Sequence, residues 1–268
     1  MQQFDLSDDH PFDEPPFSSW DTAQHGPDPI PDWVVTDLNA LDTELGVLKT
    51  GKEADVHLLH RGVPDLPGCL LAAKRYRRNE HRMFHRDAGY QEGRRTRRTR
   101  DTRAMSRRTD YGRELLAGKW AAAEFDALTR LWLAEAPVPY PVQLQGTELL
   151  LEFIGDDDGA AAPRLAQCRP STAELADLFV QCVDAMRLLA RAGWAHGDLS
   201  AYNLLVHRGR LVVIDVPQIV DIFANPQGAS FLERDCANIC RWFAGRGLET
   251  PEFDHLFGDL MAEAVARW

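Results

Sequence analysis

Apolar residues occur in short runs bounded by turn-forming residues in the first half of the chain beyond residue 33. The runs ADVHLLH (54–60) and CLLAAKRY (69–76) flank the stretch RGVPDLPG, and this pattern predicts two strands joined by a turn. A short helical piece from Trp33 is expected to lead into another strand before them, and residues 142–155 contain two more. The pattern therefore predicts a five-stranded antiparallel sheet.

Helical periodicity follows the first three strands. Ala, Phe, Leu and Trp residues recur at helical spacing over about residues 111–134 and predict one long helix that packs with the sheet. A second long helix is expected to begin at Ser171, because Ser171 and Glu174 have the spacing of a capping box. Gly193 is expected to end this helix.

Two more helices, over about residues 230–244 and 251–267, are predicted to complete the chain. Ser230 and Glu233 repeat the capping-box spacing at the start of the first one. Strands therefore dominate the first half of the chain and helices the second. The expected fold class is α+β, with two lobes: a sheet and one helix in the N-terminal lobe, and helices with a short hairpin in the C-terminal lobe.

Changes in composition divide the chain further. Residues 1–32 contain six prolines among acidic and small polar residues, which predicts a disordered acidic tail. The N-terminal lobe is assigned to residues 33–155 and the C-terminal lobe to residues 156–268. Inside the first lobe, residues 77–108 are rich in arginine and are expected to form a flexible loop. This loop is either a solvated segment or an arm that contacts the phosphates of RNA.

The overall charge narrows the classes of function. The chain has 268 residues and a net charge of −11, which argues against binding of nucleic acid over the whole surface. No apolar run is long enough for a membrane span and the N-terminus has no signal-peptide pattern, so the cytoplasm is the expected compartment. Five cysteines do not suggest a disulfide framework, and Cys236 and Cys240 are interpreted as core thiols.

Polar side chains cluster around a predicted hairpin in the second half. In GWAHGDLSAYNLLVH (193–207) and LVVIDV (211–216), Asp198 and Asn203 lie five residues apart and Asp215 ends the partner strand. Asn203 and Asp215 offer two hard oxygen ligands for Mg²⁺, and Asp198 is left to accept a hydroxyl proton. Each residue alone is typical of a turn or cap, but the joint spacing favours phosphoryl transfer.

The first lobe contains candidate groups for a nucleotide. Lys74 in the third predicted strand can reach the α- and β-phosphates, and Glu124 on the following helix can hold its ammonium group. The backbone around Glu152 and Ile154, at the end of the sheet, can pair with adenine in an apolar slot. Phosphate contacts are predicted for the turn between the first two strands: Thr50, Gly51, Lys52 and Glu53.

These motifs resemble those of the RIO kinases, a family of atypical protein kinases. The matching segments occur in the family's order over about residues 40–245: TGKEADVH, AAKRY, WAAAEF, LLLEFIG, HGDLSAYNLLV, LVVIDVPQIV and FLERDCANIC. The resemblance implies a two-lobed protein-kinase-like fold that binds ATP and Mg²⁺ between the lobes. It also implies a Ser/Thr protein kinase, and the family's work on the small ribosomal subunit suggests a link to RNA.

The resemblance also implies a role for each matching residue. Asp198 corresponds to the catalytic aspartate, and Asn203 and Asp215 to the metal ligands. Lys74 and Glu124 correspond to the pair that positions the phosphates. In this family the residue matching Asp215 can also accept phosphate, so hydrolysis of ATP through an aspartyl phosphate is a second expected activity.

Other positions match the family's hinge and loops or depart from its pattern. Glu152 and Ile154 fall on the hinge, and the arginine-rich segment falls on a mobile loop that precedes a helix. Asp55 stands where the family commonly has Asn, which places a carboxylate near the expected nucleotide. Pro217 stands where Ser is common. None of these departures removes a catalytic group.

Two other functions are consistent with the same residues. A small-molecule phosphotransferase of the aminoglycoside or choline kinase type shares the spacing of Asp198, Asn203 and Asp215, but it would need acceptor-binding helices after Asp215. A binding module for RNA or the ribosome would use the nucleotide as a switch and the arginine-rich loop as its contact surface. The phospho-acceptor, the balance of kinase and ATPase activity, and the oligomeric state do not follow from the sequence.

Overall fold

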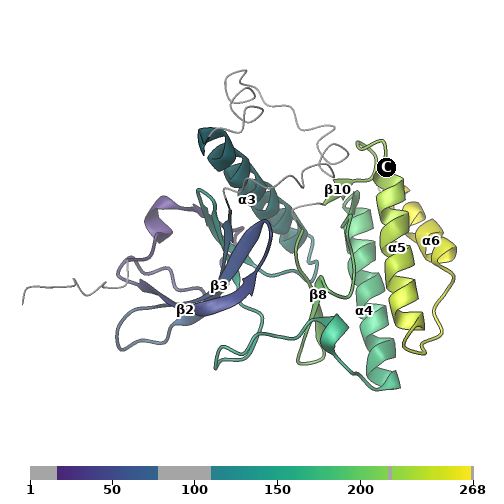
Figure 1. Cartoon of the computed structure of the whole chain (residues 1–268), viewed down its shortest axis with the longest axis horizontal. Helices are drawn as coiled ribbons and strands as arrows, with labels where there is room; N and C mark the ends of the chain where they lie inside the picture. The colour runs from purple at the N-terminus through teal and green to yellow at the C-terminus, as the bar shows by residue number, and fades with distance from the viewer. Residues whose placement is uncertain (1–16, 78–109, 217–218, 267–268) are drawn as a thin grey trace, which may run out of the picture.

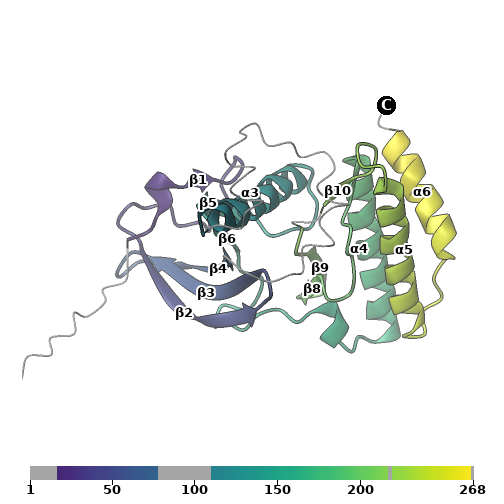
Figure 2. The ribbon, with the colours of Figure 1, turned by 45° about the horizontal axis from the view of Figure 1, so that its top comes forward.

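A six-stranded antiparallel sheet forms the first lobe. The computed structural model describes residues 17–77, 110–216 and 219–266. The sheet has the strand order β1-β5-β6-β4-β3-β2, and its strands are labelled in Figure 2. Its strands are β1 (Gln24–His25), β2 (Leu41–Thr50), β3 (Ala54–Gly62), β4 (Cys69–Tyr76), β5 (Pro141–Gln145) and β6 (Glu148–Glu152). The predicted α+β class is confirmed, and five of the strands are those expected from the sequence.

The sixth strand, β1, comes from a segment predicted to be disordered. Residues 17–32 form turns, the short 3-10 helix η1 (Trp20–Thr22) and β1, which pairs with β5. Trp20 is buried, so the expectation of a disordered tail is wrong for these residues, while residues 1–16 lie outside the described part. The prediction failed because composition averages over a segment, whereas a few apolar side chains are enough to hold it on a sheet.

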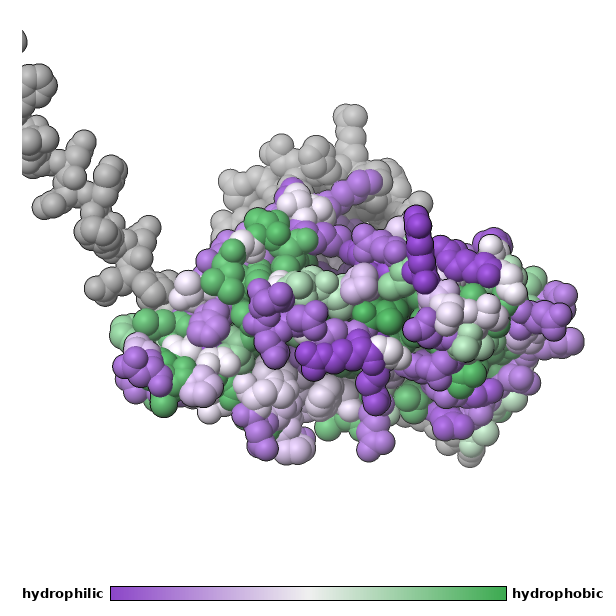
Figure 3. Space-filling model, turned by 90° about the horizontal axis from the view of Figure 1, so that it is seen from below, coloured by the Kyte–Doolittle hydropathy of each residue, from purple (hydrophilic) through white to green (hydrophobic). Residues whose placement is uncertain are grey.

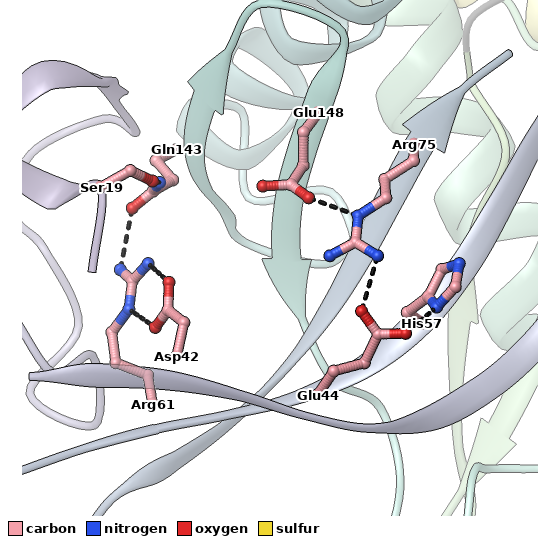
Figure 4. Close-up of polar contacts among 8 residues, drawn as sticks. All are labelled: Ser19, Asp42, Glu44, His57, Arg61, Arg75, Gln143 and Glu148. Carbon is pink, nitrogen blue, oxygen red and sulfur yellow. Dashed lines mark hydrogen bonds and ion pairs between the residues drawn. The ribbon is translucent and has the colours of Figure 1, made fainter. Parts of the chain in front are cut away.

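A buried arginine anchors this segment. The Arg61 side chain is fully buried and donates two hydrogen bonds of 2.7 Å to Asp42 and one of 2.8 Å to Gln143 (Figure 4). Gln143 in turn donates to the Ser19 hydroxyl at 2.7 Å. A buried ion pair is favourable when hydrogen bonds satisfy its remaining groups, which is the arrangement found here.

The chain before β2 is not helical. Among the described residues 33–40 the backbone forms turns, and the Asp37 carboxylate accepts hydrogen bonds from the backbone and side-chain amides of Asn39. Such local side-chain bonds compete with a helix, which explains why the helical piece expected from Trp33 is absent from this segment.

The helices and the hairpin build the second lobe around one hydrophobic core. Helix α3 (Asp110–Leu133) packs on the sheet, and its buried Phe125, Leu128 and Leu131 join the core of the second lobe. The three remaining α-helices of the described residues lie side by side, and the hairpin lies between them and the sheet (Figures 1 and 2). The elements of this lobe are η3 (Leu165–Gln167), α4 (Thr172–Arg191), β7 (Trp194–Ala195), β8 (Leu204–His207), β9 (Arg210–Val213), β10 (Val220–Asp221), α5 (Gly228–Ala244) and α6 (Phe253–Val265).

The helix starts confirm one capping box and correct another. Ser171 and Glu174 form the predicted capping box of α4. Helix α5 begins at Gly228, before the predicted start, so Ser230 lies inside the helix and the second capping box is wrong. Helix α6 begins at Phe253, two residues later than expected. Because Ser and Glu also occur inside helices, their spacing alone does not define a start.

These two serines give a matched test. We expect Ser171→Ala to lower the free energy of unfolding by about 1 kcal/mol, because the cap no longer accepts a hydrogen bond from the Glu174 amide. The exposed Ser230→Ala is expected to change it by less than about 0.5 kcal/mol, since alanine is favoured inside a helix. Urea denaturation measures both values. Equal losses in the two variants would contradict the assignment of the helix starts.

The surface and the thiols agree with a packed globular chain. On the face seen in Figure 3, hydrophilic residues predominate and apolar residues form small patches. Within the described ranges, no helix is long and apolar enough to cross a membrane. Cys236 and Cys240 are both buried, which confirms their interpretation as core thiols.

The boundary predicted between residues 155 and 156 stays a prediction, because α3 contributes to the cores on both sides of it.

Candidate active site

One ammonium group connects the two lobes. The Nζ atom of Lys74, on β4, lies 2.7 Å from Oε1 of Glu124 on α3 and 2.9 Å from Oδ1 of Asp215 after β9. Burial lowers the pKa of Lys74, but attraction to the two carboxylates outweighs this effect and the net pKa is raised. Lys74 is therefore charged at neutral pH and is held at the junction of the sheet and the hairpin.

Glu124 is a buried member of this group and not a solvated helix residue. Its side chain is 1 % exposed, and both carboxylate oxygens are used: one accepts from Lys74 and the other from the Tyr76 hydroxyl. Burial and the nearby Glu124 raise the pKa of Tyr76 well above its usual value, so the phenol stays protonated and donates. This arrangement fixes the direction of the lysine side chain.

Asp215 occupies a strained backbone position beside the lysine. Its φ angle is 67°, in the left-handed region that Asp and Asn adopt more readily than most residues. Its side chain is 38 % exposed, so it contacts Lys74 and also faces solvent. Burial raises the pKa of Asp215, but the Lys74 ammonium outweighs burial and the net pKa is lowered. The carboxylate is thus ionised and accessible to a cation.

The predicted catalytic loop is connected by hydrogen bonds to Ile214, the residue before Asp215. The Asn203 side-chain amide donates to the Asp198 backbone carbonyl at 2.9 Å, and the Asn203 carbonyl accepts from the Ile214 amide at 3.0 Å. His196 donates from Nε2 to the Ile214 carbonyl at 3.1 Å, and its Nδ1 accepts from the Asp198 amide. Asp198 itself is exposed. The loop therefore brings Asp198 and Asn203 to the same end of the hairpin as Asp215.

Asp235, which was not among the residues predicted from the sequence, holds this loop through hydrogen bonds to its backbone. Asp235, on α5, is 1 % exposed and accepts hydrogen bonds of 2.8 Å from the amides of Gly197 and Leu199, on either side of Asp198. The neighbouring Arg234 donates to the Gly197 carbonyl. A signal was present in the sequence: Asp235 lies on the apolar face of its helix, where a carboxylate needs partners.

The predicted phosphate turn joins β2 and β3. The Gly51 amide donates to the Ala54 carbonyl at 3.0 Å and closes the turn, while Thr50, Lys52 and Glu53 surround it. A Cβ atom on Gly51 would lie 2.6 Å from the Ala54 carbonyl oxygen, so the tight turn requires glycine. Burial and repulsion from Asp215 raise the pKa of Glu53, which places this side chain in the electrostatic surroundings of the site.

Asp55 does not add an unbalanced charge near the nucleotide. Its carboxylate forms an ion pair with Arg77, which lowers its pKa. Asp55 is opposite Arg75 on β4, whereas Lys74 is opposite Val56. Since neighbouring residues of a strand point to opposite faces, Asp55 and Lys74 lie on different faces of the sheet. The fold therefore does not support the expectation that Asp55 places a carboxylate near the nucleotide.

The end of β6 provides the predicted hinge. The Glu152 side chain accepts a hydrogen bond of 3.0 Å from the Tyr140 amide, and burial raises its pKa. The Ile154 carbonyl accepts from the Ala162 amide at 2.9 Å. These bonds fix the backbone between the lobes. They use neither the Glu152 carbonyl nor the Ile154 amide, which are the two groups predicted to pair with adenine.

The donor set suits a magnesium ion. Asp215 supplies a carboxylate, and Asn203 uses its side-chain amide for Asp198, which leaves its Oδ1 oxygen as a ligand. Across the described residues, no group of three or more His, Cys, Asp or Glu residues could hold a metal ion by itself. Mg²⁺ is commonly held by one or two protein oxygens together with phosphates and water, so these two residues fit such a site.

The structure has a sheet lobe with a buried Lys–Glu pair and a helical lobe with an exposed Asp in a loop, and Asp215 contacts the lysine at their junction. These features define the protein-kinase-like class. The family model described as RIO domain matches residues 71–256. The chain is 37% identical to the RIO-type serine/threonine-protein kinase Rio1 of Haloferax volcanii over 226 residues, 84% of this chain and 69% of that protein. This chain belongs to the RIO family.

Eukaryotic relatives are similar over a smaller part of their length. The chain is 31% identical to the human serine/threonine-protein kinase RIO1, over 84% of this chain and 36% of that protein. It is 30% identical to the bovine serine/threonine-protein kinase RIO3, over 78% of this chain and 40% of that protein. The chain therefore spans less than half the length of these eukaryotic relatives.

Proposed function

We propose that this chain transfers the γ-phosphoryl group of ATP to a serine or threonine hydroxyl of a protein. The observation that carries the proposal is the contact of Lys74 with Glu124 and Asp215, which joins a cation of the sheet lobe to a metal-ligating carboxylate of the helical lobe. A triphosphate needs both groups at one place, the ammonium for its phosphates and the carboxylate for Mg²⁺. The kinase names of the relatives support the same activity.

In this mechanism the protein groups position the reactants. Lys74 binds the α- and β-phosphates. Asn203 and Asp215 would hold Mg²⁺, which would supply positive charge to neutralise the phosphates. Asp198 accepts the proton of the acceptor hydroxyl while the new P–O bond forms and the bond to ADP breaks. Asp235 and His196 keep the loop in place through backbone hydrogen bonds and contact no reactant.

Hydrolysis through Asp215 is a second outcome of the same site. In this reaction a carboxylate oxygen of Asp215 attacks the γ-phosphorus, ADP leaves, and water then cleaves the acyl phosphate. The ionised, 38 % exposed side chain supports this step, because a nucleophile must be charged and accessible. The acceptor hydroxyl and the Asp215 carboxylate would then compete for the same phosphoryl group.

Two expectations from the sequence have weaker support. In the part of the chain that is described, two α-helices follow Asp215, and both contribute buried residues to the core of the second lobe. A small-molecule acceptor site on these helices stays a prediction. The arginine-rich residues 78–108 lie outside the described ranges, so contact with RNA or the ribosome stays a prediction.

An assay with γ-labelled ATP tests the proposal. With Mg²⁺, we expect the purified protein to release labelled phosphate or to incorporate label, either as acid-stable phosphate on Ser or Thr or as acid-labile phosphate on Asp215. Chelation of Mg²⁺ is expected to stop all three reactions. Neither release nor incorporation in the presence of Mg²⁺ would overturn the proposal, and stimulation by aminoglycosides or amino alcohols would favour a small-molecule acceptor.

A further inference from the structure

Lysine is rare in this chain and is concentrated near the site. Of the 30 basic residues four are lysines, and three of these lie between residues 49 and 74. Lys74 and Lys52 belong to the motifs already discussed, and Lys119 lies on the exposed surface of α3. Lys49, at the end of β2, has no role in the mechanism described above.

The sheet register places Lys49 on the same face as Lys74. Lys49 is directly opposite Val56 on β3, and Val56 is directly opposite Lys74 on β4. Residues directly opposite each other in an antiparallel sheet point to the same face, and two strand spacings separate their Cα atoms by about 10 Å. Arg75, the neighbour of Lys74, belongs to the polar cluster on the other face (Figure 4). The row of Lys49 and Lys74 therefore faces Asp215.

A β-bulge is the reason that Lys49 points this way. Val47 is opposite His57, and Lys49 is opposite Val56, so Leu48 is an extra residue in β2. Without the bulge, strict alternation would put Lys49 on the same face as the exposed Val47. Bulges often redirect a side chain beside a functional site.

The electrostatic surroundings of Lys49 are those of the active site. Burial lowers the pKa of Lys49. The positive charges of Arg164 and Lys74 lower this pKa further, whereas the carboxylates of Asp215 and Glu124 raise it in part. Lys49 in turn lowers the pKa of Asp215. Among the described residues, the ion pairs at the site use Lys74 and leave Lys49 without a carboxylate partner. The side chain of Lys49 is exposed and has no counter-ion in the described part of the chain, so its ammonium group is accessible to a bound anion.

We infer that Lys49 supplies a second ammonium group to the phosphate chain of a bound nucleoside triphosphate. Lys49 contacts the phosphates from β2, and Lys74 contacts them from β4 on the same face of the sheet. The inference rests on the proposed function, since it names a further contact in the same site. A lysine suits this place because its compact charge can follow a phosphate group that moves during transfer, whereas an arginine fork holds one fixed geometry.

A reactive nucleotide tests the contact directly in the wild-type protein. The probe is an ATP analogue with an acyl group on its γ-phosphate: a nearby lysine amine attacks the acyl carbonyl, an amide bond forms, and ATP leaves. Mass spectrometry can measure the acylation of the four lysines separately. We expect Lys49 to be acylated at least about tenfold more than Lys119, and excess MgATP to suppress this labelling. The lowered pKa of Lys49 favours its free amine.

Kinetics of a variant provide the second measurement. For Lys49→Met we expect the KM for ATP to rise about tenfold with kcat changed less than about threefold, because the lost contact is made before and during transfer. Lys119→Met is the matched control and is expected to keep both constants. If the protein turns over ATP but Lys49 is labelled no more than Lys119, the inference about Lys49 is overturned and the proposed function stands. Absence of both turnover and labelling would overturn the proposed function as well.

Discussion

Replacement of Asp215 by asparagine is expected to lower Mg²⁺-dependent ATP turnover by about a thousandfold and to abolish acid-labile labelling. The amide keeps the size of the side chain but removes the negative charge proposed to hold the metal. It also replaces the ionised carboxylate, which can accept phosphate, by a neutral and much weaker nucleophile. Loss of metal stabilisation of the transition state costs several kcal/mol, and each 1.4 kcal/mol, roughly, is a factor of ten in rate. Steady-state phosphate release and acid-labile labelling measure the two losses.

Asparagine is the right substitution because of the backbone at this position. Asp215 has a φ angle of 67°, and asparagine tolerates this conformation better than alanine does. The free energy of unfolding is therefore expected to change little, and Lys74 keeps its ion pair with Glu124. Asp259→Asn, on the exposed surface of α6, is the charge-matched control and is expected to retain full turnover. Turnover of Asp215→Asn within threefold of the wild type would refute the assigned metal site.

The second large effect is expected at Asp235, which contacts no reactant. Asp235→Ala leaves the amides of Gly197 and Leu199 buried without their acceptor. One unsatisfied buried group costs about 1–3 kcal/mol, so we expect a loss of about 3 kcal/mol in the free energy of unfolding. This corresponds to a fall in Tm of roughly 6–12 °C for a chain of this size.

Turnover separates a positioning role from a purely structural one. At a temperature where Asp235→Ala is folded, we expect kcat to fall by about a hundredfold with a smaller change in the KM for ATP. The amides of Gly197 and Leu199 flank Asp198, whereas Lys74, the proposed phosphate-binding residue, lies on the sheet. Glu233→Ala, exposed on the same helix, is expected to retain both stability and turnover. An Asp235→Ala protein that is less stable but has normal kcat would show that the two hydrogen bonds serve the fold alone.

The core of the candidate site could be predicted because its residues belong to recognisable motifs. Lys74 contacts Glu124, 50 residues away in the sequence, and Asp215, 141 residues away, and the motifs predict all three residues around one nucleotide. Their roles in binding and catalysis stay predictions until the assays above are done. Asp235 was missed because a carboxylate on the apolar face of a helix indicates that it needs partners but not which backbone amides donate to it.

Local patterns determined most of the elements and the tertiary structure corrected their ends. The residues of β4 agree with the predicted strand, since apolar residues bounded by turn formers define a strand locally. The predictions missed strand β1 and placed the start of α5 wrongly, because both features depend on contacts outside the local pattern. Strand β1 pairs with β5, and α5 begins where Gly228 packs closely against Ile222. Such packing is not encoded in the spacing of neighbouring residues.

By itself the sequence determined the fold class and the family resemblance, and it named Lys74, Asp198, Asn203 and Asp215 as candidate site residues, because these follow from periodicity and from motifs read along the chain. The tertiary structure alone decided which side of the sheet Lys49 faces and what Asp235 holds. The physical reason is the same in both cases: a bulge changes the direction of every later side chain in its strand, and a buried charge is stable only beside partners that folding brings to it.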